Sequence, residues 1–240
     1  MLASLPSSAT DTESTSYTVR LCASAEDLLE AHKIRCTVFH EEQGFPLETE
    51  IDEYDPFSAH FLAIGTSKST GLSRTLGTIR WVPYPFPDTA SFTFQPGADK
   101  ALPIGPVRDE SAVQAQFAQN TAPTAVAADG AASAEQKLLL PGGKLTRLAV
   151  SKEARGQRIG ELLVRESEKW VLNAISSQLP SRSGKGQVQG QGSFRSAKLV
   201  VSSQMPVIRF YTRLSYLPVG EVYDEEGAPH QRLEKVVIFF

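Results

Sequence analysis

The sequence is poor in cysteine and histidine, with two Cys and four His among its 240 residues. Neither Cys22 nor Cys36 has a partner at CxxC spacing, which argues against a disulfide framework and for a reducing compartment. Both are predicted to be small, buried hydrophobic side chains. The scattered histidines and cysteines also lack the spacing of zinc ligands, so we expect no metal site.

Long apolar runs and an excess of basic charge are missing as well. No segment approaches the roughly 18 consecutive apolar residues of a transmembrane helix. The N-terminus lacks the basic and apolar stretches of a secretory signal and the arginines of a mitochondrial presequence. The formal net charge of −3 gives no support for a general nucleic-acid surface. We therefore expect a cytoplasmic protein, with the nucleus left open, that binds small molecules rather than nucleic acid or membrane; a homodimer is also left open.

The common phosphate-binding motifs, G-x-x-x-x-G-K-[ST] and G-x-G-x-x-G, are absent too. Residues 145–164 instead predict a buried strand, a short basic turn and an amphipathic helix. Gly156 and Gly160 would let the backbone approach an anion closely, and the first helical N–H groups have no partners of their own. Arg155 and Arg158 add positive charge. The segment predicts an anion-binding turn, with a plain strand-to-helix connection as the alternative.

Hydrophobic periodicity predicts a mixed sheet with helices packed against it. Ser24 is a plausible N-cap for the first helix, and Pro206 suits the first turn of the last one. Between these two, a further helix should carry its apolar face from Ile159 to Ala174. The expected strands cover residues 17–23, 60–64, 76–82, 144–150, 198–203, 219–223 and 233–239.

Composition divides the chain into one folded unit with added segments. Residues 1–16 are rich in Ser and Thr and predict a disordered tail. Residues 17–240 predict a single domain. Two stretches of low complexity, at about 83–140 and 180–195, are interpreted as insertions on its surface.

Three segments, taken in order, resemble one family. The first opens with Arg35-Cys-Thr-Val-Phe-His-Glu-Glu-Gln-Gly and continues through 50–55 to His60; the second is 155–160; the third is 203–216 with Glu225-Glu-Gly-Ala-Pro-His230. Together they resemble a subgroup of the GNAT superfamily of N-acetyltransferases over residues 17–82, 144–176 and 197–240. Arg158 stands where the family usually has glycine, and we expect it to take helical backbone angles. The resemblance implies an α/β (α+β) GNAT fold, with helices on both faces of a mixed central sheet.

The resemblance also implies a reaction: acetyl transfer from acetyl-CoA, as cosubstrate, to a primary amine of a small molecule or peptide by direct attack in a ternary complex. A strand edge would hold the pantetheine arm and the basic turn the pyrophosphate. The matching positions are Leu148, Ala149, Val150, Arg155, Gly156, Gln157, Arg158, Ile159 and Gly160.

Tyr211 matches the tyrosine that protonates the departing thiolate in this family; the alternative is a core aromatic on a helical stripe. Glu42 and His60 match family positions that line the acceptor cleft and are the candidates for direct catalysis. The carboxylates of residues 50–55 look like a solvated acidic loop. His230 could contact the substrate or cap a turn.

Two other functions stay open. Six residues of the front half also resemble the pattern of acyl-homoserine lactone synthases, although 155–160 look built for CoA; these six are Arg35, Phe39, Glu50, Asp52, Asp55 and Arg80. A non-catalytic acyl-CoA sensor would keep the basic turn and need no Tyr211. Arg80 and Arg147 could bind an acidic substrate group, but we expect them to pair with Glu50 or Asp52.

Overall fold

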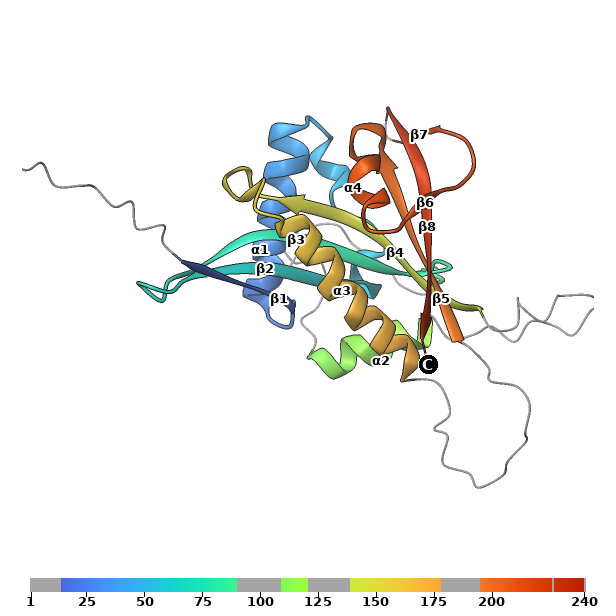
Figure 1. Ribbon diagram of the computed structural model, residues 1–240, viewed down its shortest axis with the longest axis horizontal. Helices are drawn as coiled ribbons and strands as arrows, with labels where there is room; N and C mark the ends of the chain where they lie inside the picture. The colour runs from blue at the N-terminus through green and yellow to red at the C-terminus, as the bar shows by residue number, and fades with distance from the viewer. Residues whose placement is uncertain (1–13, 90–108, 121–138, 178–194, 226, 240) are drawn as a thin grey trace, which may run out of the picture.

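An eight-stranded mixed sheet organises the protein (Figure 1). The computed structural model describes residues 14–89, 109–120, 139–177, 195–225 and 227–239. The strand order is β1-β2-β3-β4-β5-β8-β6, with β7 paired to β8, and only β4 and β5 run parallel. The strands are β1 (Thr15–Leu21), β2 (Ala59–Ser67), β3 (Ser73–Tyr84), β4 (Leu139–Val150), β5 (Arg195–Gln204), β6 (Leu217–Pro218), β7 (Tyr223–Glu225) and β8 (Ala228–Phe239).

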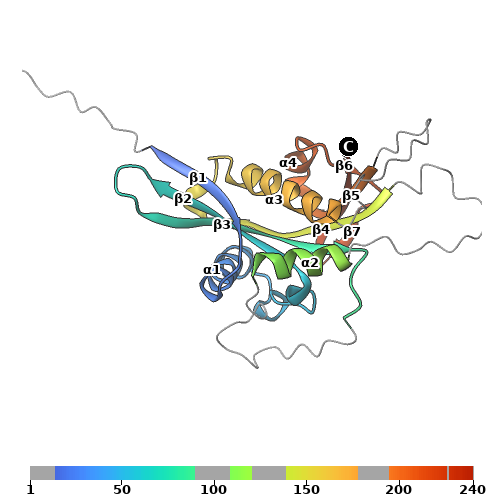
Figure 2. The same ribbon diagram turned by 90° about the horizontal axis from the view of Figure 1, so that it is seen from below.

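Helices cover both faces of the sheet, as predicted: α1 lies on one face, and α3 and α4 lie on the other (Figure 2). The Ser24 Oγ caps α1 by accepting a hydrogen bond of 3.2 Å from the Asp27 N–H. The helices are α1 (Ala25–Arg35), α2 (Glu110–Asn120), α3 (Ile159–Ser176) and α4 (Ile208–Thr212). A π-helix, η1 (Cys36–Glu42), continues α1, and short 3₁₀ helices occur at η2 (Leu47–Thr49), η3 (Asp55–Phe57), η5 (Lys152–Ala154) and η6 (Met205–Val207).

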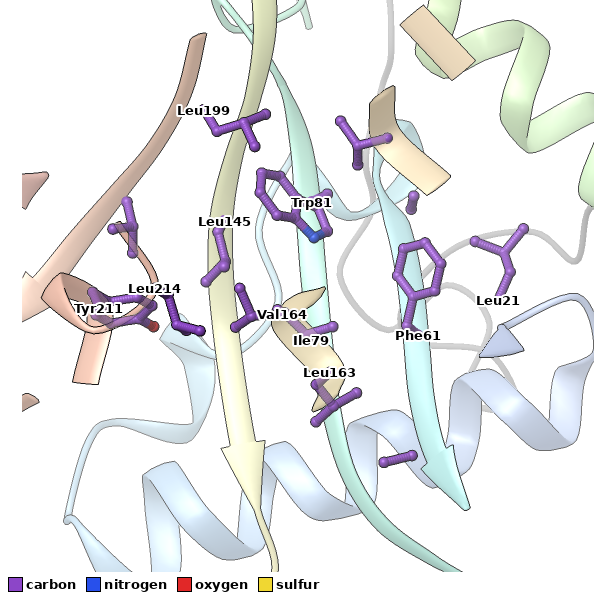
Figure 3. Close-up of a cluster of buried hydrophobic side chains, with 14 of the residues drawn as sticks. Leu21, Phe61, Ile79, Trp81, Leu145, Leu163, Val164, Leu199, Tyr211 and Leu214 are labelled. Atoms are coloured by element: carbon purple, nitrogen blue, oxygen red, sulfur yellow. The ribbon is translucent and has the colours of Figure 1, made fainter. Parts of the chain in front are cut away.

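Strand alternation separates two cores. On β2, Phe61 belongs to the larger cluster under α3, whereas Leu62 belongs to a smaller cluster under α1. Trp81 is fully buried in the larger cluster (Figure 3). Its Nε1–H donates a 2.8 Å hydrogen bond to Ser167 Oγ of α3. This bond satisfies the one polar atom of the largest core side chain, so α3 is fixed in position across the middle of the sheet.

The predicted closing strand over 219–223 is wrong. Gly220 has φ +76°, a left-handed conformation that interrupts an extended chain, and the chain pairs with β8 through β6 and β7 on either side instead. The predicted disordered tail is too long as well, because β1 begins at Thr15 and pairs with β2; residues 1–13 lie outside the described residues.

The interpretation of 83–140 as a surface insertion is also too simple. Strand β3 extends to Tyr84, β4 begins at Leu139, and α2 lies beside the C-terminal half of α3 (Figure 1). Val113 of α2 is 4% exposed and belongs to the larger core, and Trp170 of α3 donates to Glu110 at 3.3 Å. Part of this segment therefore belongs to the packed domain; 90–108, 121–138 and 178–194 lie outside the described residues.

A pair of α2 variants tests that packing. Val113→Asp places a charge in the core and should lower the free energy of unfolding by about 2 kcal/mol or more. Ala112→Asp, at the exposed neighbouring position, should change it by no more than about 0.5 kcal/mol. Urea denaturation followed by circular dichroism measures both. Equal effects of the two variants would show that α2 does not belong to the core.

Candidate active site

The two parallel strands separate part-way along their length. Pairing of β4 with β5 ends at Leu145 opposite Val201, although β4 continues to Val150 and β5 to Gln204. Arg147 has φ +50° at a bulge in β4, which bends the strand away from its neighbour. The second half of β4 thus has an edge without a strand partner in β5, and its backbone groups are open to a ligand.

Two cavities flank this gap. The first, the sheet cavity, has a volume of about 190 Å³ and is lined by η1, the loop after it, β4, β5, α4 and the β7–β8 hairpin. The second, the loop cavity, measures about 880 Å³ and lies between the 155–161 segment and α4. Leu148 lines the first and Val150 the second, so the open edge of β4 leads from one to the other.

The basic turn is a strained start to α3. Gly156 has φ +78° and Arg158 has φ +61°, so the expectation of helical angles at Arg158 is wrong. A left-handed conformation costs a non-glycine residue about 1–2 kcal/mol, which accounts for the glycine usual at this position in the resembling family. The turn aims the unpaired N–H groups of the first turn of α3 at the loop cavity. Four arginines and one glutamate line that cavity: Arg155, Arg158, Arg165, Arg213 and Glu161.

The predicted backbone sites on β4 divide by strand alternation. The Ala149 carbonyl faces β3, close to Gly77, and Ala149 is 2% exposed. Leu148 and Val150 therefore present their backbone groups to the open edge. The Val150 carbonyl already accepts a 3.0 Å hydrogen bond from Arg155 Nε. A ligand would therefore compete with this arginine for the carbonyl, or accept hydrogen bonds from the backbone N–H groups of the open edge.

Glu42 lies outside both cavities and forms an ion pair of 2.7 Å with Arg155. The pair connects the end of η1 to the basic turn. Tyr17 of β1 adds a second connection by donating to Gln157 Oε1 at 2.8 Å. These contacts give Glu42 a role in positioning the turn, and the geometry offers no support for its predicted place in catalysis.

Three of the carboxylates after η1, namely Glu50, Asp52 and Asp55, belong to a largely buried ion network and not to a solvated loop, whereas Glu53 is exposed. Asp55 is fully buried and bridges Arg35 and Arg80, each at 2.9 Å. Arg80 also binds both oxygens of Asp52 at 2.7 Å. The two arginines hold the pKa of Asp55 well below its usual range, against the effect of burial, so it is ionised at neutral pH.

Glu50 and Arg147 complete the network. Arg35 binds Glu50, and Arg147 lies 3.5 Å from Glu50 and 3.6 Å from Asp52. Arg147 also donates to the Thr49 carbonyl at 2.6 Å. The expected pairing of Arg80 and Arg147 with these acids is confirmed. Three arginines and three carboxylates balance in charge, and they fix the 49–55 segment against β3 and β4.

His60 lies on β2 within this network and lines neither cavity. Its Nε2 is 3.1 Å from the Asp55 carbonyl, and its buried Nδ1 has no partner among the described residues. Burial lowers the pKa of His60 from 6.5 to about 4, so the ring is neutral at pH 7. The geometry therefore gives no support for the predicted catalytic role of His60.

Tyr211 of α4 belongs to the larger core, as the alternative interpretation expected (Figure 3), and it also lines the sheet cavity. Its hydroxyl has no hydrogen-bond partner among the described residues, and burial alone raises the pKa of the phenol above its ordinary value. The neighbouring Tyr216 is different, because its hydroxyl donates to Glu168 at 2.7 Å inside the core. Tyr211 is thus a protonated donor facing the cavity, and Tyr216 is already paired.

Three polar residues of the sheet cavity were not among the predicted catalytic residues. His230 Nδ1 lies 2.9 Å from the Ala228 carbonyl, which can only accept, so Nδ1 carries the proton and Nε2 is an acceptor. Lys144 and Glu225 line the same cavity. The motif ending in His230 was visible in the sequence, but pairing of Gln204 with His230 across β5 and β8 is what brings the histidine to the cavity.

No protein-family model matches the sequence, and no curated protein is detectably similar to it. Solved structures do match. A Lactobacillus plantarum protein assigned as an N-acetyltransferase is 17% identical, with a TM-score of 0.51 over 92% of this chain and 97% of that one. The fold is that of the GNAT acyltransferases. Escherichia coli ElaA (17% identity, TM-score 0.48, 92% and 99% of the chains) and the acyl-homoserine lactone synthase LasI (14%, 0.47, 92% and 90%) also match.

Within the described residues of this GNAT fold, no group of three or more His, Cys, Asp or Glu side chains is arranged to hold a metal ion. None of the helices described is both long and apolar enough to cross a membrane.

The buried histidine predicts a pH dependence of stability. Between pH 6.5 and about 4 the unfolded chain binds a proton at residue 60 that the folded chain excludes. Stability should therefore fall as the pH drops through this window, by about 3 kcal/mol from this group. His60→Gln, which cannot titrate, should flatten the dependence in urea denaturation between pH 4 and 8. The exposed-histidine control His40→Gln should keep the wild-type slope; a wild-type slope in His60→Gln would contradict the assignment.

Proposed function

We propose that this protein is an acetyl-CoA-dependent N-acetyltransferase that acts on a primary amine in a ternary complex. One observation carries the proposal: a cavity with an unpaired tyrosine and an acceptor histidine is joined, along an unpaired strand edge, to a basic cavity at a helix N-terminus. The Lactobacillus plantarum protein that shares the fold has been assigned as an N-acetyltransferase, which agrees with this function.

The residues present fit an acyl-CoA. The excess of arginine over glutamate in the loop cavity, together with the free N–H groups of α3, suits a pyrophosphate. Leu148 and Val150 would bind the pantetheine amides along the open edge of β4. Bound acetyl-CoA would supply the acetyl group as a thioester in the sheet cavity.

Tyr211 and His230 divide the proton transfers between them. An ammonium acceptor first releases one proton to solvent and becomes the attacking amine. As the N–C bond forms and the C–S bond breaks, His230 Nε2 accepts the second proton of that nitrogen, and Tyr211 donates its own to the departing sulfur. Because burial raises the pKa of Tyr211, the phenol keeps its proton through the whole neutral range.

The lactone-synthase alternative receives less support from the geometry. Five of the six residues that resemble that pattern are Arg35, Glu50, Asp52, Asp55 and Arg80, and they bind one another in the ion network. Their arrangement is explained by folding, and the basic loop cavity favours CoA. The Tyr211 experiment below distinguishes an enzyme from a non-catalytic acyl-CoA sensor.

Acetyl-CoA binding is tested at Gly160, in the first turn of α3. A Cβ at this position would lie 3.5 Å from the Phe210 ring, an ordinary contact, so Gly160→Ala should fold normally. The extra methyl groups of Gly160→Val reach further into the loop cavity and should weaken acetyl-CoA binding at least tenfold, about 1.4 kcal/mol. Isothermal titration measures both affinities. Wild-type acetyl-CoA affinity in Gly160→Val would contradict the assignment of the loop cavity to CoA.

The general acid is tested with two matched variants. Tyr211→Phe removes only the hydroxyl and should lower kcat by on the order of 100-fold, while acetyl-CoA affinity stays near wild type. Tyr216→Phe removes a hydroxyl bound to Glu168 and should lower stability by about 1–3 kcal/mol, with little effect on kcat. Turnover of a panel of amines and thermal melts measure the two effects. Full activity in Tyr211→Phe would mean that another group protonates the sulfur.

A further inference from the structure

Lys144 is an unusual residue in the wall of the sheet cavity. Its side chain is 18% exposed, and its Nζ lies 5.4 Å from the centre of the Phe86 ring. The described residues offer it no hydrogen bond; its one carboxylate neighbour, Glu225 Oε1, is 3.9 Å away. Burial and three nearby arginines lower the pKa of Lys144. A mostly buried ammonium group with so little compensation is costly unless a ligand completes its surroundings.

Glu225 faces the same gap with one free oxygen. Its Oε2 accepts hydrogen bonds from Ser202 Oγ and from the Tyr223 hydroxyl, and these bonds, with the charge of Lys144, keep the pKa of Glu225 low against the effect of burial. Its Oε1 has only the distant Lys144 as a partner among the described residues. The cavity wall thus presents one cation and one anion that share a long ion pair of 3.9 Å without a hydrogen bond, which leaves hydrogen-bonding capacity on both for a ligand.

The other charges of the cavity are already paired. Glu50 is bound by Arg35, and Arg147 donates to the Thr49 carbonyl and contacts both Glu50 and Asp52. What remains for a ligand is the separated pair of Lys144 and Glu225, with His230 beside them. A ligand that carries both charges would satisfy both groups at once.

From this arrangement we propose that the acceptor is a free amino acid, whose carboxylate binds Lys144 and whose ammonium group binds Glu225 next to His230. The proposal rests on the acetyl transfer proposed above, and the amino group of the amino acid would be acetylated by the steps given there. The cavity, at about 190 Å³, is small beside the roughly 300–1,000 Å³ of pockets for drug-sized ligands, which suits an acceptor of this size.

Other amine classes fit this pair less well. A polyamine would place a second cation against Lys144, and an amino sugar would leave the lysine without a counter-charge. A peptide N-terminus carries an amide where the amino acid has its carboxylate, so Lys144 would meet a neutral carbonyl. Each of these acceptors offers Lys144 no carboxylate, and only the zwitterion adds a counter-charge to both members of the pair.

Matched acceptors test the proposal in steady-state assays with acetyl-CoA. The twenty amino acids are compared with their amides and with the corresponding decarboxylated amines. The best free acid should exceed its amide at least tenfold in kcat/KM. Lys144→Met should reduce that ratio at least tenfold, mainly through KM for the acid. Lys198→Met is the control: this lysine, on β5, binds Glu234 at 3.0 Å outside the cavity, and the variant should keep the wild-type ratio.

Calorimetric titration of the same amino acids without acetyl-CoA gives a second readout. Binding of the preferred acid to the wild type, weakened at least tenfold in Lys144→Met, supports the carboxylate site even if transfer fails. Equal use of acids, amides and amines, or an unchanged ratio in Lys144→Met, overturns the amino acid proposal and leaves acetyl transfer in place. Failure of acetyl-CoA to bind while amino acids still bind overturns the proposed function instead.

Discussion

The structure depends on the buried ion network that joins Arg35, Asp55 and Arg80. These residues come from α1, η3 and β3, which are far apart in the sequence, and the network extends to Glu50, Asp52 and Arg147. Buried charges of this kind are costly to leave unpaired: removing one partner costs about 3–5 kcal/mol. The segment 43–58, whose only regular elements are the short 3₁₀ helices η2 and η3, is therefore held in one place, and part of it lines the sheet cavity.

The network also explains how the sheet cavity can exist beside a well-packed core. Arg147 takes a left-handed backbone conformation in β4, and its contacts with Glu50, Asp52 and Thr49 compensate for that strain. The bulge there coincides with the end of pairing between β4 and β5. One set of ion pairs thus stabilises both the loop wall and the break in the sheet, and the open strand edge follows from that break.

A second strained position, Arg158, lies at the other end of the same edge. The Glu42–Arg155 and Tyr17–Gln157 contacts hold the basic turn against η1 and β1. Between these two fixed points lie Leu148, Val150 and Tyr211. The basic turn and the bulge in β4 are thus held by ion pairs and hydrogen bonds, whereas Lys144 and Glu225 in the sheet cavity share only a long ion pair of 3.9 Å.

The sequence by itself determined the order of the main strands and helices, the cap of α1, the basic turn and the position of Tyr211 on an apolar stripe. These features are local: hydrophobic period, capping residues and turn glycines act within a few residues. The tertiary structure decided the rest. It placed α2 in the core, interrupted the strand expected at 219–223, buried Glu50 and Asp55, and separated Glu42 and His60 from the cavity. It also brought Lys144, Glu225 and His230 together. Each of these outcomes depends on contacts between residues distant in the chain, where burial and charge pairing override the preference of any single segment.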